Sequence, residues 1–160
     1  MNNISDFQIP RWEELPSIEL YLDQVVNLLE DYLKNLISFK EDKFITKTMI
    51  NNYVKHGILK PPVNKKYNRT HIARLIVICI LKQVYSINDI NSLIKLALET
   101  SSIEISYNKF CTFLEKSICS IFNKITYVEE DEMTDQRYIL KNVVQSFANK
   151  LYVEKNFLNK

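Results

Sequence analysis

The chain has very little glycine and proline. It contains one glycine and four prolines in 160 residues. Tight β-hairpins favour glycine at turn positions with positive φ, so its scarcity argues against a sheet-rich fold. Leucine and isoleucine are abundant, and hydrophobic residues make up 46% of the chain, which is enough for a sizeable core. The composition therefore predicts an almost entirely helical protein of the all-α class.

The chain is also poor in the residues that usually form covalent, metal or catalytic sites. Cys79, Cys111 and Cys119 are its three cysteines, and their odd number and apolar surroundings exclude a disulfide framework and indicate core thiols. His56 and His71 are its two histidines. The sequence shows no Ser/His/Asp or Cys/His arrangement and no glycine-rich phosphate loop. We therefore expect no enzymatic activity, no cofactor and no metal.

Targeting and membrane signals are missing as well. The N-terminus has no basic segment followed by an apolar run, so no signal peptide is indicated. The longest unbroken apolar run, Leu75–Leu81, is far shorter than a bilayer requires. We expect a soluble cytoplasmic protein without a membrane partner.

Acidic residues are missing from one long window. From Lys43 to Lys82 the sequence has nine Lys or Arg and no Asp or Glu, a formal charge of +9. The whole chain carries only +2, so the residues outside the window sum to −7. A bias towards A/T-rich codons would explain many lysines, but it does not explain why this window lacks acids. The window is the strongest indication of a polyanionic partner such as DNA.

The sequence before this window predicts two segments. Residues 1–16 lack helical periodicity and indicate an irregular arm, in which Trp12 is either a packing anchor or a ligand contact. From Ser17 to Ser38 apolar residues recur every three or four positions, which predicts a long helix with Ser17 as its N-cap. The polar stretch Phe39–Ile45 predicts a connection.

Inside the window, a short helix is followed by a basic turn. Thr46 predicts the N-cap of the helix, and Gly57 predicts its end. Pro61–Pro62 exclude further helix and indicate a turn or a short strand. The turn has a basic tip at Asn64–Lys66, and Tyr67 is expected to anchor it to the core.

Four further helices are expected. The first is capped by Asn68 or Thr70 and runs to about Val84, and it is apolar on most sides, which places it at the centre of the core or at an interface. The other three have one apolar face each. A polar break at Thr100–Glu104 and an exposed acidic linker at Val128–Thr134 separate them. Their predicted bounds are Ile87–Leu98, Ser106–Lys124 and Asp135–Phe157.

The string ITKTMINNYVKHGIL, Ile45–Leu59, resembles the recognition helix of MerR-type winged helix-turn-helix regulators. In that family a capping Ser or Thr opens a helix with an aromatic pair, which Gly-Leu-Leu and prolines follow. The corresponding residues are Thr46, Asn52–Tyr53, Gly57–Leu59 and Pro61–Pro62. The similarity covers roughly Phe44–Leu98. The wider stretch from Ile9-Pro10-Arg11-Trp12 onwards is similar to an uncharacterised family of MerR-like proteins found mainly in low-GC Firmicutes.

This resemblance implies a winged helix-turn-helix with a minimal wing in residues 1–98, which also hold the N-terminal arm and helix. Residues 99–160 are then a C-terminal helical extension for dimerisation or sensing. The implied partners are double-stranded DNA and a second copy of the chain, because one small module contacts too few base pairs for useful specificity. An effector cannot be named from the residues.

Two kinds of side chain are candidates for DNA contact. Cations neutralise phosphates, and asparagine is able to bond adenine bidentately in the major groove. The alternatives are a solvated helix surface and a soluble loop tip, and Arg74 is either a surface residue or a phosphate contact. The candidate site consists of Lys47, Thr48, Asn51, Asn52, Lys55, Lys65, Lys66, Asn68 and Arg69.

The sequence leaves two hypotheses for function. The first is a dimeric, sequence-specific DNA-binding transcriptional regulator. The second is a helical protein-binding adaptor that keeps the winged-helix shape without binding DNA. The second is motivated by Asn51, which stands where the family has an arginine, and by the shortness of Pro62–Tyr67 as a wing.

Overall fold

The computed structural model describes residues 3–37, 44–126 and 132–158. Within these ranges the chain forms α-helices and one pair of very short strands, which confirms the all-α class. Short 3₁₀ turns precede the first strand, and a π-helical turn follows the last helix. The α-helices are α1 (Leu22–Leu33), α2 (Lys47–Lys55), α3 (Arg69–Leu81), α4 (Ile87–Leu98), α5 (Ile103–Asn123) and α6 (Asp135–Val153).

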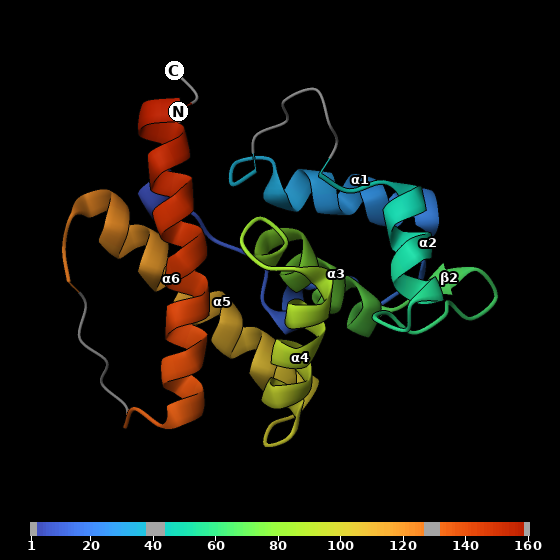
Figure 1. Ribbon diagram of the computed structural model, residues 1–160. Coiled ribbons are helices and arrows are strands. Elements are labelled where there is room, and N and C mark those ends of the chain that lie inside the picture. The colour runs from blue at the N-terminus through green and yellow to red at the C-terminus, as the bar shows by residue number, and fades with distance from the viewer. Residues whose placement is uncertain (1–2, 38–43, 127–131, 159–160) are drawn as a thin grey trace.

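Helix α3 lies in the middle of the molecule, as its apolar sequence predicts. Figure 1 shows α1 and α2 on one side of it and α6 on the other. It packs against α1, α4, α5 and α6. Its buried residues surround the helix axis, so α3 is enclosed on nearly every side. They are His71, Ile72, Ala73, Leu75, Ile76, Ile78, Cys79, Ile80 and Leu81.

The predicted helix Ser17–Ser38 is wrong at both ends. Leu20–Tyr21 form strand β1, which pairs antiparallel with β2 (Lys66–Tyr67). Tyr21 is the N-cap of α1, and its extended backbone N–H donates to Gln24 Oε1 at 2.9 Å. Only the apolar residues from Leu22 onwards lie in α1, because the residues before it pair as a strand. At the other end, α1 stops at Leu33, before the predicted end of the helix. Ser38 and most of the Phe39–Ile45 connection lie outside the described residues.

A tight hairpin turn joins α2 to β2, although it contains no glycine. Val63 and Lys66 exchange two backbone hydrogen bonds of 3.1 and 3.0 Å. The two residues between them, Asn64 and Lys65, have φ of 51° and 63°. Two successive left-handed residues match the twist of a two-residue hairpin, a role that asparagine tolerates well. The scarcity of glycine therefore excluded long sheets but not this turn.

The predicted polar break at Thr100–Glu104 is also partly wrong. Helix α5 begins at Ile103, and the Ser102 hydroxyl caps it by accepting from the Ile105 N–H at 3.3 Å. The prediction began this helix at Ser106. A serine immediately before an apolar residue is a capping signal, but the prediction placed Ser102 in the polar break.

The N-terminal arm packs on the body, as predicted. The guanidinium of Arg11 forms a bidentate ion pair with Glu115 of α5, with N–O distances of 2.7 and 2.8 Å. The Tyr107 hydroxyl donates to the carbonyl of Pro10 at 2.6 Å. Paired hydrogen bonds between charged groups fix orientation as well as position. The arm is thereby tied to a helix far along the chain.

One cluster of buried side chains runs through the molecule from Ile9 in the arm to Leu151 in α6. Helix α6 packs on α5 and on α3. The division of the chain at residue 98 stays a prediction, since the described residues on both sides of it share this cluster. Cys79 and Cys111 are buried free thiols, as expected, and Cys119 is half-buried.

The end of α2 offers a test of the fold. Gly57 has φ of +74°, and an added Cβ would meet no atom within 4 Å. Gly57→Ala should therefore lower the free energy of unfolding by about 1–2 kcal/mol, for conformational reasons alone. Urea denaturation measures the change. Gly57→Asn is the control and should cost clearly less, because asparagine tolerates positive φ; equal losses for the two variants would contradict the assignment.

Candidate nucleic-acid interface

Helix α2 has a buried face and an exposed face, which its sequence sets up. The Thr46 hydroxyl accepts a hydrogen bond from the Met49 N–H at 3.1 Å and so caps the helix as predicted. Ile50 and Tyr53 point into the core. Positions three and four apart on a helix share a face, so the polar residues between the buried ones point outward together. All five are exposed: Lys47, Thr48, Asn51, Asn52 and Lys55.

The segment that follows α2 is held to α3 by two side-chain contacts. After Gly57 the chain turns inward, and Ile58 and Leu59 are buried. Arg74 Nη1 donates to the carbonyl of Ile58 at 3.1 Å, and His71 Nε2 lies 3.0 Å from the carbonyl of Lys60. Buried or half-buried carbonyls beyond a helix need such partners. The exposed face of α2 is therefore set in place by side chains of α3.

The hairpin turn stands beside α2 at one edge of the molecule (Figure 1). Lys65 is exposed at its tip. Lys66 is half-buried, and its ammonium lies 5.4 Å from the centre of the Tyr21 ring. Tyr67 is buried, as predicted, and anchors the turn. The exposed face of α2 and the hairpin tip together form what we call the basic edge, composed of Lys47, Thr48, Asn51, Asn52, Lys55 and Lys65.

Four of the nine predicted site residues have structural partners. Lys47 forms an ion pair with Asp23 of α1, and Lys66 lies over the Tyr21 ring. The Asn68 side chain accepts from the His71 N–H at 3.1 Å and caps α3. The side-chain oxygen of Asn68 and the ammonium of Lys66 are therefore already engaged by other residues of the chain.

Arg69 is the fourth of these residues. Its Nη2 donates to the carbonyl of Leu15 at 3.0 Å, and its guanidinium lies 5.7 Å from the centre of the Trp12 ring. Such a position over an aromatic ring suits a guanidinium. Arg69 thus holds the N-terminal arm, and Trp12 is a packing anchor rather than a free side chain.

The other five predicted residues make no side-chain hydrogen bond or ion pair with any described residue. They are Thr48, Asn51, Asn52, Lys55 and Lys65. Sequence reasoning missed Tyr21 and Asp23, which approach the basic edge from the start of α1. No local pattern could have found them, because their partners lie far along the chain.

Burial shifts the ionisable groups near α2 towards their neutral forms. Burial raises the pKa of the Tyr53 phenol and of the Cys79 thiol to about 12 each, so both stay neutral at physiological pH. Burial lowers the pKa of Lys82, whose ammonium donates to the carbonyl of Phe44. A neutral thiol is a poor nucleophile. What remains on the surface is a set of cations and amides, which suits binding.

The described ranges hold neither a metal-ligand cluster nor a membrane-spanning helix. No group of three or more His, Cys, Asp or Glu side chains there is placed to hold a metal ion. None of the helices that the structure describes has the length and apolar character needed to cross a bilayer.

Residues 10–110 match a family model described as a domain of unknown function, DUF1836. The match covers more than half of the chain, and the chain belongs to this family. It includes the N-terminal arm from Pro10, the basic edge, α3 and α4, and the first part of α5. Comparisons with curated proteins and with solved structures gave no match.

The cap at Asn68 separates a structural role from a binding role. Asn68→Ala should lower the free energy of unfolding by about 1 kcal/mol, because the Asn68 side chain satisfies an N–H at the start of α3. Asn68→Asp keeps an accepting oxygen and should retain most of the stability. Chemical denaturation of the three proteins measures both effects. Wild-type stability in the alanine variant would show that the cap is unimportant.

Proposed function

We propose that the protein is a dimeric, sequence-specific DNA-binding regulator in which α2 is the recognition helix and the hairpin turn is a minimal wing. One observation carries the proposal: the basic edge. On it, amides and cations of α2 point outward together, and a lysine-tipped hairpin stands next to them. The stretch from Lys43 to Lys82 adds nine cations and no acid. This pairing of helix and basic loop is the arrangement that winged helix-turn-helix proteins offer to DNA.

The residues of the basic edge divide into two roles. Asn51 and Asn52 are amides able to bond adenine in the major groove, and Thr48 sits one turn earlier, near the end of the helix that enters a groove. Lys55 and Lys65 supply charge for phosphates on either side. Lys47 can join them if it exchanges Asp23 for a phosphate, a change that occurs on an exposed surface where ion pairs are weak.

The neighbourhood of α2 supports a helix-turn-helix reading. Helix α1 packs against α2 and against α3. It also carries β1, which pairs with the strand of the hairpin. This is the order of parts expected from the resemblance to MerR-like regulators, with α1 as the supporting helix. Such a regulator would act in the cytoplasm.

A dimer follows from the size of the interface. Helix α2 has nine residues and presents five side chains. A single module of this kind reads only a few base pairs, so selective binding needs two half-sites about 34 Å apart. In this proposal the C-terminal helices α5 and α6 are the candidates for the dimer contact.

A second function is favoured by one surface feature. Ile18, Tyr21 and Val63 are large apolar residues that are 69%, 53% and 64% exposed. Tyr21 and Val63 lie next to the hairpin turn. Exposed apolar groups of this kind suit a protein partner. A protein-binding adaptor would use this surface, and it would show no binding to DNA even at low salt.

The phosphate contacts can be tested through salt. The variant Lys55→Ala/Lys65→Ala should reduce the slope of log affinity against log salt by about 2 per protomer, because two phosphate contacts are lost. Fluorescence anisotropy with a duplex from the chain's own promoter region measures the slope between about 50 and 200 mM salt. The matched control is Lys95→Ala/Lys155→Ala, which removes the same charge from exposed positions in α4 and after α6. Equal slopes for the two variants would contradict the claim that the basic edge contacts phosphates.

The base contact requires a different readout. Asn51→Ala should reduce the preference for the promoter duplex over a scrambled duplex of the same composition by about fivefold or more, while affinity for the scrambled duplex stays nearly constant. The experiment compares the two dissociation constants at one salt concentration. If both affinities fall by the same factor, Asn51 does not read a base. If the wild-type protein binds neither duplex at low salt, the adaptor function is favoured.

A further inference from the structure

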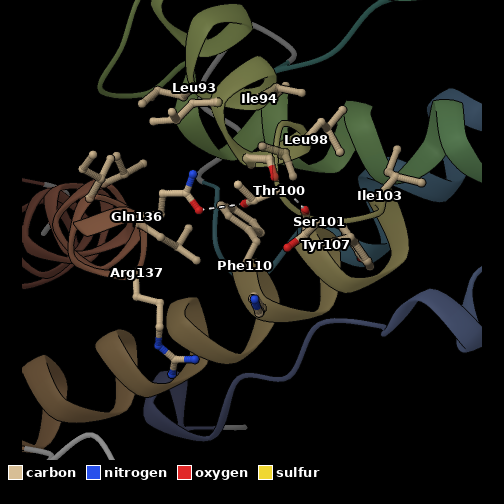
Figure 2. A pocket seen from close by; sticks show the side chains of 18 of the residues that line it. Leu93, Ile94, Leu98, Thr100, Ser101, Ile103, Tyr107, Phe110, Gln136 and Arg137 are labelled. Atoms are coloured by element: carbon tan, nitrogen blue, oxygen red, sulfur yellow. Dashed lines mark hydrogen bonds between the residues drawn. The ribbon is translucent and has the colours of Figure 1, made fainter. Parts of the chain in front are cut away.

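A cavity of about 150 Å³ lies between α3, α4, α5 and the start of α6. Figure 2 shows Leu93, Ile94 and Leu98 of α4 on one wall and Tyr107 and Phe110 of α5 on the facing wall. The cavity is separate from the basic edge. It lies where the part of the chain with the hairpin meets the C-terminal helices.

The walls of the cavity are mostly apolar, and their charges are of one sign. The charged side chains that line it are Arg74, Lys109 and Arg137, and no Asp or Glu of the described residues does so. Arg137 lies 5.4 Å from the centre of the Phe113 ring and extends away from the other labelled side chains in Figure 2. An apolar space with cations and no acid at its walls is suited to an amphipathic anion.

Arg74 lines the cavity and also contacts the segment that follows α2. It comes from α3 and is half-buried. The structure gives its guanidinium one hydrogen bond to a described residue, from Nη1 to the carbonyl of Ile58. Burial lowers its pKa, and no neighbouring carboxylate raises it again. A guanidinium has five N–H donors in a planar fork, so donors remain for a carboxylate.

We propose that this cavity binds a small organic acid with an apolar body, and that Arg74 pairs with its carboxylate. The volume sets the scale of the body: about 150 Å³ accommodates one benzene-sized molecule. A benzoate-like aromatic acid or a short aliphatic acid meets both conditions. Thr100 Oγ1 donates to Gln136 Oε1 at 2.7 Å at the cavity edge and so joins the α4–α5 turn to α6 (Figure 2).

The cavity is physically connected to the recognition surface. The same arginine that lines the cavity bonds the carbonyl of Ile58, directly after the glycine that ends α2. A carboxylate on Arg74 redistributes its donors, and the position of the end of α2 changes with them. The ligand is therefore an effector of DNA binding, an extension that rests on the proposed function.

Binding is tested first without DNA. Benzoate, benzyl alcohol and benzylamine have the same ring and differ in charge, and isothermal titration and thermal shift measure each. Benzoate should bind with a dissociation constant of about 1 mM or tighter and raise the melting temperature. The alcohol and the amine should bind at least about tenfold more weakly, because they cannot pair with the guanidinium. Equal binding of alcohol and benzoate, or no binding of benzoate at about 10 mM, would overturn the proposal.

Two matched variants locate the site. Arg74→Gln keeps a donor for the Ile58 carbonyl and should lower the affinity for benzoate by about tenfold or more. Lys109→Gln removes a charge from the same walls and should change this affinity by less than about threefold. The reverse order would overturn the assignment to Arg74. Ala97→Phe places a large side chain at the exposed rim of the cavity and should abolish binding. Binding that survives this change would show that benzoate sits elsewhere. If Arg74→Gln does not fold, the ranking of the three probes on the wild-type protein still decides.

The effector role has its own readout. Saturating benzoate should change the affinity for the promoter duplex by at least about fivefold in the wild-type protein and not in Arg74→Gln. If benzoate binds but the affinity for DNA is unchanged, the binding site stands and the regulatory role is refuted. If the protein binds benzoate but no DNA at low salt, the binding site stands and the proposed function is refuted.

Discussion

The burial of α3 on nearly every side is the constraint on which the rest of the structure depends. Each of its isoleucines and leucines contributes about 1.5–3 kcal/mol when removed from water, and no face of the helix can be left open. The chain meets this need by packing α1, α4, α5 and α6 around it. The polar side chains that α3 does carry are used at its ends and edges. Asn68 caps the start of α3, His71 contacts the carbonyl of Lys60, and Arg74 donates to the carbonyl of Ile58 just after α2.

Because α3 contacts both α2 and the cavity, the surface and the interior of the molecule are mechanically linked. The outward face of α2 is set by Ile50 and Tyr53 inside and by Arg74 at its end. The N-terminal arm adds a second link, since Arg69 at the start of α3 holds Leu15 and Trp12, and Arg11 holds α5. A ligand, a mutation or a partner that moves α3 would therefore change the position of the basic edge.

Local signals in the sequence predicted what local chemistry decides. Thr46 and Gly57 were expected at helix ends and are found there, because caps depend on neighbouring residues. The start of α1 was not predictable in this way. Leu20–Tyr21 become a strand only because Lys66–Tyr67 are available to pair with them, and periodicity within the segment cannot report a distant partner.

The candidate site shows the same limit. Composition and spacing placed the cations and amides of α2 on one exposed face, where the structure has them. They could not show that Arg69 is occupied by Leu15 or that Lys47 meets Asp23, since both contacts join separate parts of the chain. The cavity was not predicted either, because its walls are apolar residues with the same spacing as ordinary core residues.

The central claim, that the basic edge contacts DNA, is tested most directly by NMR titration of the protein with the promoter duplex. The side-chain amide signals of Asn51 and Asn52, and the backbone signals of Lys47–Lys55 and Asn64–Lys66, should show the largest changes. Changes centred on α6 or on the arm, or no changes at low salt, would contradict the claim.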